Sequence, residues 1–158
     1  MIQRTMINKE YWSQDFPIPL GPDDNDVTIF TDNMIEGKTL LLGCTKKLLD
    51  LSDVQIDLDP WWVGPNTITG NWLDNRDFYD NILCDGSLSF TKELADDIID
   101  MASKNCKVFI ARTFTRKLSI MRIADYFPQP TDFNILPTKT IVFEDYSFYI
   151  WQFYKGLK

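Results

Sequence analysis

Short segments that contain glycine or polar residues follow four apolar runs of the chain. Residues of these types at these positions could bind a ligand or take part in a reaction. The four segments are Gly43-Cys44-Thr45, Asp57, Asn71-Trp72 and Asp85-Gly86. If each apolar run is a strand of a parallel sheet, each segment lies at or beyond a carboxyl end, where such sheets bind ligands. The sequence therefore predicts one cleft that all four segments border.

Each segment also has a purely structural interpretation. Gly43 could simply make a strand-to-helix turn, and Asp57 could brace the turn at Asp59-Pro60. Trp72 could be an ordinary core residue, and Asp85-Gly86 is a turn dipeptide in any fold. These alternatives stay open for each residue taken alone. The order of the four segments, each after its own strand, favours a shared site.

Hydrophobic spacing predicts the elements that position these segments. Short, almost wholly apolar runs bounded by turn residues indicate buried strands. Five strands are expected, at Thr39–Leu42, Val54–Asp57, Ile68–Leu73, Tyr79–Cys84 and Lys107–Ala111. Two further strands, Thr140–Phe143 and Phe148–Tyr154, are expected to form an antiparallel hairpin.

Helices are expected between the strands. They are Asp23–Ile35, Lys46–Leu51, a helix that begins after Thr91, and Leu118–Phe127. Gly37 is expected to end the first helix, while Thr45 and Thr91 are expected to cap the second and third. Strands that alternate with helices predict an α/β fold with a doubly wound, mainly parallel sheet and a C-terminal antiparallel hairpin.

Length and composition favour one globular domain. The 158 residues, 44% of them hydrophobic, suffice for one core but not for two ordinary domains. We expect a single domain over residues 1–158, whose first 22 residues form a packed N-terminal extension. Trp61-Trp62 are expected to pack a loop onto the core in preference to lining a substrate opening.

Charge and cysteine content disfavour several partners and compartments. The net charge of −7 repels phosphate backbones, so neither nucleic acid nor an anionic membrane surface is a favoured partner. Three widely spaced cysteines without a secretory leader predict reduced thiols and a cytoplasmic protein. No apolar run approaches the roughly 20 residues that cross a bilayer, so a soluble protein is expected.

The chain contains no histidine, which removes the usual general base of hydrolases and the commonest metal ligand. Cys44 and Cys84 could approach each other at the carboxyl edge of the sheet. Two thiols alone make an incomplete metal site, so no metal is assigned.

Three segments together carry a family resemblance: residues 39–49, 70–74 and 83–88. They resemble a divergent branch of the class I S-adenosylmethionine-dependent methyltransferases, and the likeness runs from about Tyr11 to the terminal hairpin. The resemblance implies a Rossmann-like methyltransferase fold, S-adenosylmethionine (SAM) as cofactor, S-adenosylhomocysteine (SAH) as product, and a small-molecule acceptor.

The resemblance also implies a role for each candidate residue. Gly43, Cys44 and Thr45 would contact the methionine part of the cofactor, and Asp57, with Leu58 beside it, would hold the ribose hydroxyls. Asn71, Trp72 and Leu73 would flank the adenine. Asp85 and Gly86 would face the methionine end or the substrate. Asp85 is the candidate general base, although an already nucleophilic acceptor would need none. We expect the Asp57 side chain to face solvent at its strand end.

One departure from the family pattern bears on these roles. Only Gly43 remains of a loop that commonly carries several glycines. SAM has no phosphate that must lie against the backbone, so this loss weakens an NAD-binding interpretation more than it weakens SAM binding.

Other functions stay open. The main alternative is a non-catalytic Rossmann-like module that binds a nucleotide-like ligand or a protein partner, because fold does not fix function. A receiver-like domain is disfavoured because its first strand should end in an acid, where Gly43-Cys44-Thr45 stands. An acceptor bound partly by a second subunit, in a homo-oligomer, is an alternative to a small acceptor bound by one chain.

Overall fold

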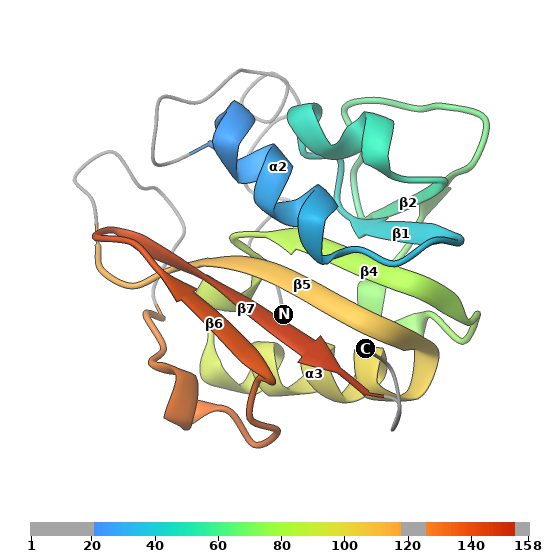
Figure 1. The fold of residues 1–158 in the computed structure, drawn as a ribbon. Helices are drawn as coiled ribbons and strands as arrows, with labels where there is room; N and C mark the ends of the chain where they lie inside the picture. The colour runs from blue at the N-terminus through green and yellow to red at the C-terminus, as the bar shows by residue number, and fades with distance from the viewer. Residues whose placement is uncertain (1–20, 118–125, 154–158) are drawn as a thin grey trace.

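The computed structural model describes residues 21–117 and 126–153 and contains a seven-stranded mixed sheet (Figure 1). The strand order is β3-β2-β1-β4-β5-β7-β6. The strands are β1 Thr39–Leu42, β2 Val54–Asp57, β3 Thr67–Thr69, β4 Tyr79–Asp85, β5 Cys106–Phe114, β6 Lys139–Val142 and β7 Tyr146–Gln152. Strands β1 to β5 pair in parallel, and β7 pairs antiparallel with both β5 and β6. The predicted doubly wound sheet with a terminal hairpin is confirmed.

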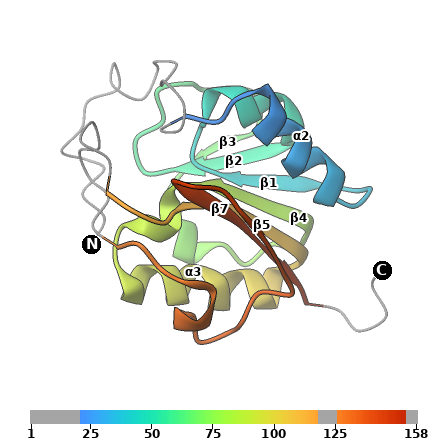
Figure 2. The ribbon, with the colours of Figure 1, turned by 60° about the vertical axis from the view of Figure 1, so that its left-hand side comes forward.

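Helices cover both faces of this sheet. Helix α2 (Asp24–Asn33) lies on one face and α3 (Lys92–Asn105) on the other, as both ribbon views show (Figures 1 and 2). Asp23 caps α2 with a capping box, in which the Asp23 side chain accepts from the Asp26 N–H and the Asp26 side chain accepts from the Asp23 N–H. Thr91 caps α3 by accepting from the Leu94 N–H, as predicted.

Two apolar clusters hold the layers together. One lies between the sheet and α3, and the other lies between the sheet and α2. All four residues of β1 are buried, which is the pattern of a central strand covered on both sides. This burial explains why an uninterrupted apolar run, and not an alternating one, marks β1 in the sequence.

The predicted third strand, Ile68–Leu73, is wrong in its second half. Strand β3 ends at Thr69, and Trp72–Asp74 forms a 3-10 turn, η3. The cause is local, because the Asn71 side chain accepts from the Leu73 N–H and caps this turn. Asparagine at a cap position therefore overrides the β propensity of the residues around it.

Other boundaries also differ from the prediction. Residues Lys46–Leu51 form a 3-10 turn, η2, and the Thr45 side chain makes no capping hydrogen bond to it. Helix α2 ends at Asn33, before the glycine expected to end it, and Met34 is its C-cap. Strand β5 is longer than predicted, because it pairs along its length with both β4 and β7.

Two predictions fall largely on undescribed parts of the chain. Of the N-terminal extension, residues 1–20 lie outside the described residues, as do residues 118–125 of the predicted helix Leu118–Phe127. The last two residues of that predicted helix, Tyr126 and Phe127, are not helical.

Candidate functional site

The turn after β1 is the centre of the candidate site. Gly43 has φ +99°, which favours glycine, and its N–H donates to the Ile56 carbonyl of β2 at 2.7 Å. A Cβ built on Gly43 would lie 3.9 Å from Trp72 Cζ2 and 4.0 Å from Asp57 Oδ2, which are its nearest neighbours among the described residues. Three of the four predicted segments, the turn after β1, the end of β2 and the η3 turn, therefore approach one another here.

One backbone oxygen joins these segments. The Ile56 carbonyl accepts from the Gly43 N–H and also from the Trp72 indole Nε1, each at 2.7 Å. A carbonyl oxygen has two lone pairs, so both bonds can form together. The position of the Gly43 turn relative to Trp72 is thus fixed through the residue that precedes Asp57.

Asp57 does not face solvent, contrary to our expectation. Its exposed fraction is 0%, so its carboxylate lies inside the protein at the end of β2. The Asp59 N–H lies 3.4 Å from Asp57 Oδ1, which is too long for a strong brace of the following turn. A carboxylate is costly to bury, so its place beside the Gly43 turn calls for partners that repay the cost.

Trp72 belongs to the hydrophobic core. It is 1% exposed and packs within the cluster on the α3 side, which supports the core interpretation that the sequence left open. The edge of its indole also approaches the Gly43 turn, as the Cζ2 distance shows. Of its neighbours, Asn71 uses its side-chain oxygen as a cap and Leu73 packs partly buried against the same core.

The loop after β2 lies over the Gly43 turn. The Trp61 Nε1 donates to the Cys44 carbonyl at 2.8 Å, and Cys44 Sγ lies 3.7 Å from the Trp62 carbonyl oxygen. Both tryptophans are half-buried, and Leu58 packs partly buried against the core. These contacts fix the loop to Cys44, one of the predicted cofactor-binding residues, whereas the packing of Trp61-Trp62 onto the core stays a prediction.

Asp85 ends β4 at the same edge of the sheet, and Gly86 follows it. Asp85 pairs in register with Arg112 of β5, and the two side chains form a bidentate ion pair. Arg112 Nε donates to Asp85 Oδ1 at 2.5 Å, and Nη2 donates to Oδ2 at 3.2 Å. The carboxylate is therefore held in a fixed orientation, which weighs against Asp85 as a freely exchanging general base. Gly86 has φ +79°, so a larger residue would be strained there.

Arg112 is the residue that sequence reasoning missed. Its side chain is 1% exposed and that of Asp85 is 8% exposed. Burial alone would lower the pKa of Arg112, but the charge and hydrogen bonds of Asp85 raise it above its ordinary value. An arginine directly after the apolar run that forms β5 is the sequence signal that could have suggested a buried charge here.

Two aromatic rings and a second carboxyl group complete this cluster. The guanidinium carbon lies 4.8 Å from the Tyr146 ring centroid and 5.2 Å from that of Phe114. The Tyr146 hydroxyl donates to Asp26 Oδ1 at 2.8 Å, and Asp26 is fully buried in the first turn of α2. Burial raises the pKa of Asp26 and of Tyr146. The end of β4 is thereby linked through β5 and β7 to the start of α2.

Cysteine and metal chemistry find no support among residues 21–117 and 126–153. Burial raises the pKa of the Cys84 thiol well above its ordinary value and also raises that of Cys106, so both thiols stay protonated near neutral pH. No group of three or more potential metal ligands occurs in these residues. No helix in them is long and apolar enough to cross a membrane.

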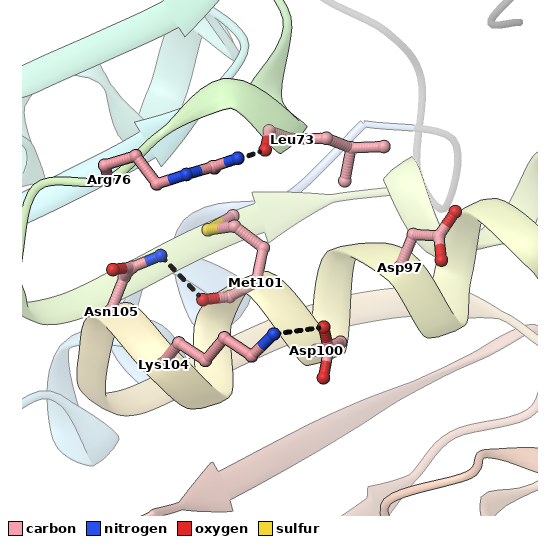
Figure 3. A pocket seen from close by; sticks show the side chains of 7 residues that line it. All are labelled: Leu73, Arg76, Asp97, Asp100, Met101, Lys104 and Asn105. Carbon is pink, nitrogen blue, oxygen red and sulfur yellow. Dashed lines mark hydrogen bonds and ion pairs between the residues drawn. The ribbon is translucent and has the colours of Figure 1, made fainter.

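A surface pocket of about 320 Å³ lies elsewhere, between η3 and α3 (Figure 3). Leu73 and Arg76 line one side, and α3 residues from Asp97 to Asn105 line the other. In this pocket Arg76 Nη1 donates to the Leu73 carbonyl at 2.8 Å, and Lys104 pairs with Asp100 at 3.1 Å. Of the predicted site residues, only Leu73 lines it, so this pocket is not the predicted cleft.

Comparisons with known proteins identify the fold. No protein-family model matches the chain, and no curated protein matches it. The magnesium protoporphyrin IX methyltransferase of Synechocystis PCC 6803, solved with bound SAM, has a TM-score of 0.53 and 16% identity over 77% of this chain and 72% of that chain. The structure of the same enzyme with bound SAH has a TM-score of 0.53 and 15% identity, over 78% of this chain and 76% of that chain.

A third solved structure agrees. The CcbJ methyltransferase of Streptomyces caelestis has a TM-score of 0.51 and 13% identity, over 70% of this chain and 58% of that chain. At such identities the likeness concerns the arrangement of strands and helices. The chain has the fold of the class I SAM-dependent methyltransferases.

Proposed function

We propose that this protein binds SAM across the carboxyl ends of β1, β2 and β4 and transfers its methyl group to a small-molecule acceptor, releasing SAH. The observation that carries the proposal is the meeting of Gly43, Asp57 and Trp72 at one turn. The structures with the same fold include one solved with SAM and one solved with SAH. We extend these two ligands from those enzymes to the present chain.

The residues present fit such a cofactor. Among the described residues, no atom lies closer than 3.9 Å to a Cβ built on Gly43, so these residues leave room for a ligand to approach the backbone there. Asp57 would accept from the ribose hydroxyls, with Leu58 beside it, because a carboxylate can accept two hydrogen bonds from a diol. Cys44 and Thr45 would border the methionine part, while Asn71, Trp72 and Leu73 would border the adenine.

Bound SAM supplies a methyl group activated by a positive sulfonium, so the task of the protein is largely positioning. Asp85 is tied to Arg112 by two hydrogen bonds, which favours a role for its charge over a role as general base. We therefore infer an acceptor that is already nucleophilic, for which no proton need be removed first. Asp85 and Gly86 would face the methionine end or this acceptor.

We propose that the whole sheet and the helices that cover it form one domain of a cytoplasmic protein. Its net charge of −7 favours a small acceptor over nucleic acid. An acceptor bound partly by a second copy of the chain is the alternative arrangement, and sedimentation of the protein with and without SAH distinguishes the two.

One observation favours the rival function, a non-catalytic module. Asp57 and Trp72 are 0% and 1% exposed, so the protein itself buries both side chains. Such burial is what a fold that has lost its cofactor would show. SAM binding requires that the carboxylate exchange its present partners for the ribose.

Calorimetric titration of the full chain with SAM and with SAH tests the proposal. We expect both to bind at a single site, and we expect NAD, whose pyrophosphate needs a glycine-rich turn, to bind much more weakly. If neither SAM nor SAH binds to protein that melts cooperatively, the proposed function is wrong. Saturable binding of SAH with no methyl transfer to any of a panel of amine, thiol and carboxylate acceptors would favour the non-catalytic module.

A further inference from the structure

The buried ion pair at the end of β4 is costly for the fold and needs a reason. Arg112 occupies a face of β5 that it shares with the buried apolar residues Val108, Ile110 and Phe114. A well-packed apolar residue at the same place would avoid the desolvation of two charges, and replacing buried ion pairs in this way is often neutral or stabilising. Stability alone therefore does not account for a charged pair at this position.

The geometry of the pair suggests what it does. The guanidinium donates to both oxygens of the carboxylate, so the planar fork fixes the Asp85 side chain in its rotamer and in its plane. The rings of Tyr146 and Phe114 lie against the guanidinium, so Arg112 itself is held in place. A carboxylate retains further lone pairs beyond the two bonds of a bidentate arginine. Asp85 is thus presented as a fixed hydrogen-bond acceptor.

Its place on the sheet points this acceptor toward the proposed cleft. Asp85 is the last residue of β4, and β4 is the neighbour of β1, whose end carries the Gly43 turn. The side chain of Asp85 is 8% exposed, whereas that of Arg112 is 1% exposed. The carboxylate is therefore the more exposed member of the pair and the one that a ligand in this cleft could reach.

We propose that Arg112 is a positioning residue, which holds the Asp85 carboxylate so that it accepts a hydrogen bond from the ammonium group of the amino-acid part of SAM or SAH. This inference rests on the proposed function and adds to it a specificity determinant on β5. Arg112 acts through Asp85 and does not touch the ligand. The two residues should therefore behave as one unit toward any ligand that carries an ammonium group.

The test compares SAH with 5′-methylthioadenosine, which keeps the adenosine and the thioether but lacks the amino-acid part. We expect Arg112→Met and Asp85→Asn each to weaken SAH binding by about 10- to 150-fold, the range for losing a hydrogen bond to a charged group. Binding of 5′-methylthioadenosine should change by less than about threefold, within the usual error of additivity. The double variant should lose no more than either single variant, because residues that act as a unit are not additive.

Arg116→Met is the matched control. Arg116 lies just beyond β5 and also pairs with a carboxylate, Asp145, but its side chain is 58% exposed. We expect this variant to bind both ligands as the unaltered protein does, because exposed ion pairs contribute little. If Arg112→Met does not fold, Arg112→Lys keeps the positive charge without the planar fork and is expected to show the same selective loss at smaller size.

The outcomes separate the possible failures. Equal weakening of SAH and 5′-methylthioadenosine binding in the folded variants would mean that Arg112 only supports the fold. Losses that add in the double variant would mean that Arg112 contacts the ligand independently of Asp85. Either result overturns the inference while the proposed function stands, whereas failure of the unaltered protein to bind SAH overturns the proposed function itself.

Discussion

Asp57→Ala is the substitution that tests the proposed site most directly. Asp57 ends β2, is 0% exposed, and places Oδ2 at 4.0 Å from the Cβ position of Gly43. If its carboxylate accepts from the ribose hydroxyls, removing it loses hydrogen bonds to a charged group worth roughly 1.5 to 3 kcal/mol. At 1.4 kcal/mol for each factor of ten, SAH binding should weaken by about 10- to 150-fold.

Burial adds a second, separable effect. Removing a buried carboxylate leaves its former hydrogen-bonding partners unsatisfied, at about 1 to 3 kcal/mol of folding free energy. For a chain of this size, each kcal/mol lowers the melting temperature by roughly 2 to 4 °C. We therefore expect Asp57→Ala to melt at a lower temperature and still fold, and Asp57→Asn, which keeps the shape of the side chain, to melt closer to the unaltered protein.

Calorimetry with two ligands distinguishes the ribose role from the structural one. The unaltered protein should bind SAH more tightly than the 2′-deoxy analogue of SAH, and Asp57→Ala should bind the two nearly equally. Asp59→Ala, two residues further along, is the control and should keep the preference. Undiminished SAH binding by folded Asp57→Ala would refute the reasoning and leave Asp57 as a structural carboxylate.

Three further predictions follow from local geometry. Gly43→Ala should destabilise the protein by about 1 to 3 kcal/mol, because φ is +99°, and should weaken SAH binding. The control is Gly70→Ala, where a Cβ meets nothing closer than 4.0 Å among the described residues, and it should change little in thermal melts or titrations. Trp72→Phe and Trp151→Phe each remove a buried indole donor and should lower the melting temperature similarly, but only Trp72→Phe should weaken SAH binding; equal affinities would favour a purely core role. Folding lowers the pKa of Asp80, chiefly through a backbone hydrogen bond, so the stability that Asp80 contributes is complete above the ordinary pKa of 3.8 and is lost as the pH falls through the folded-state pKa. In urea unfolding, Asp80→Asn should therefore lower the free energy of unfolding more at pH 7 than at pH 3. An equal loss at both pH values would contradict this.

The sequence predicted the central strands well because their signals are local. Strands β1 and β2 have the predicted bounds. β1 is a short apolar run, and β2 alternates Val54 and Ile56 with polar residues just before the turn at Asp59-Pro60. Strand β3 was overextended because the cap at Asn71 depends on one side-chain hydrogen bond, which outweighs the apolar character of the residues that follow.

The candidate site was predicted in part, and the missing part is non-local. That the ends of β1, β2 and β4 meet follows from parallel pairing alone, so the approach of Gly43 to Asp57 could be predicted. The pairing of Asp85 with Arg112 depends on the register between β4 and β5, which are separated along the chain by the 3-10 turn η4 (Ser87–Ser89) and by α3. The burial of Asp57 likewise depends on the packing of distant segments, which spacing does not reveal.

The two interpretations of Trp72 are not exclusive once its hydrogen bond is considered. Its Nε1 and the Gly43 N–H share the Ile56 carbonyl, so the core residue and the glycine turn are anchored to the same atom of β2. The next residue, Asp57, is thereby placed against the turn by the packing of the core itself. A site whose members are fixed by buried hydrogen bonds is preorganised, which lowers the entropic cost of binding a ligand. Burial of Trp72 therefore supports a ligand site at Gly43 as well as the fold, and its effect on binding should come through the position of the turn.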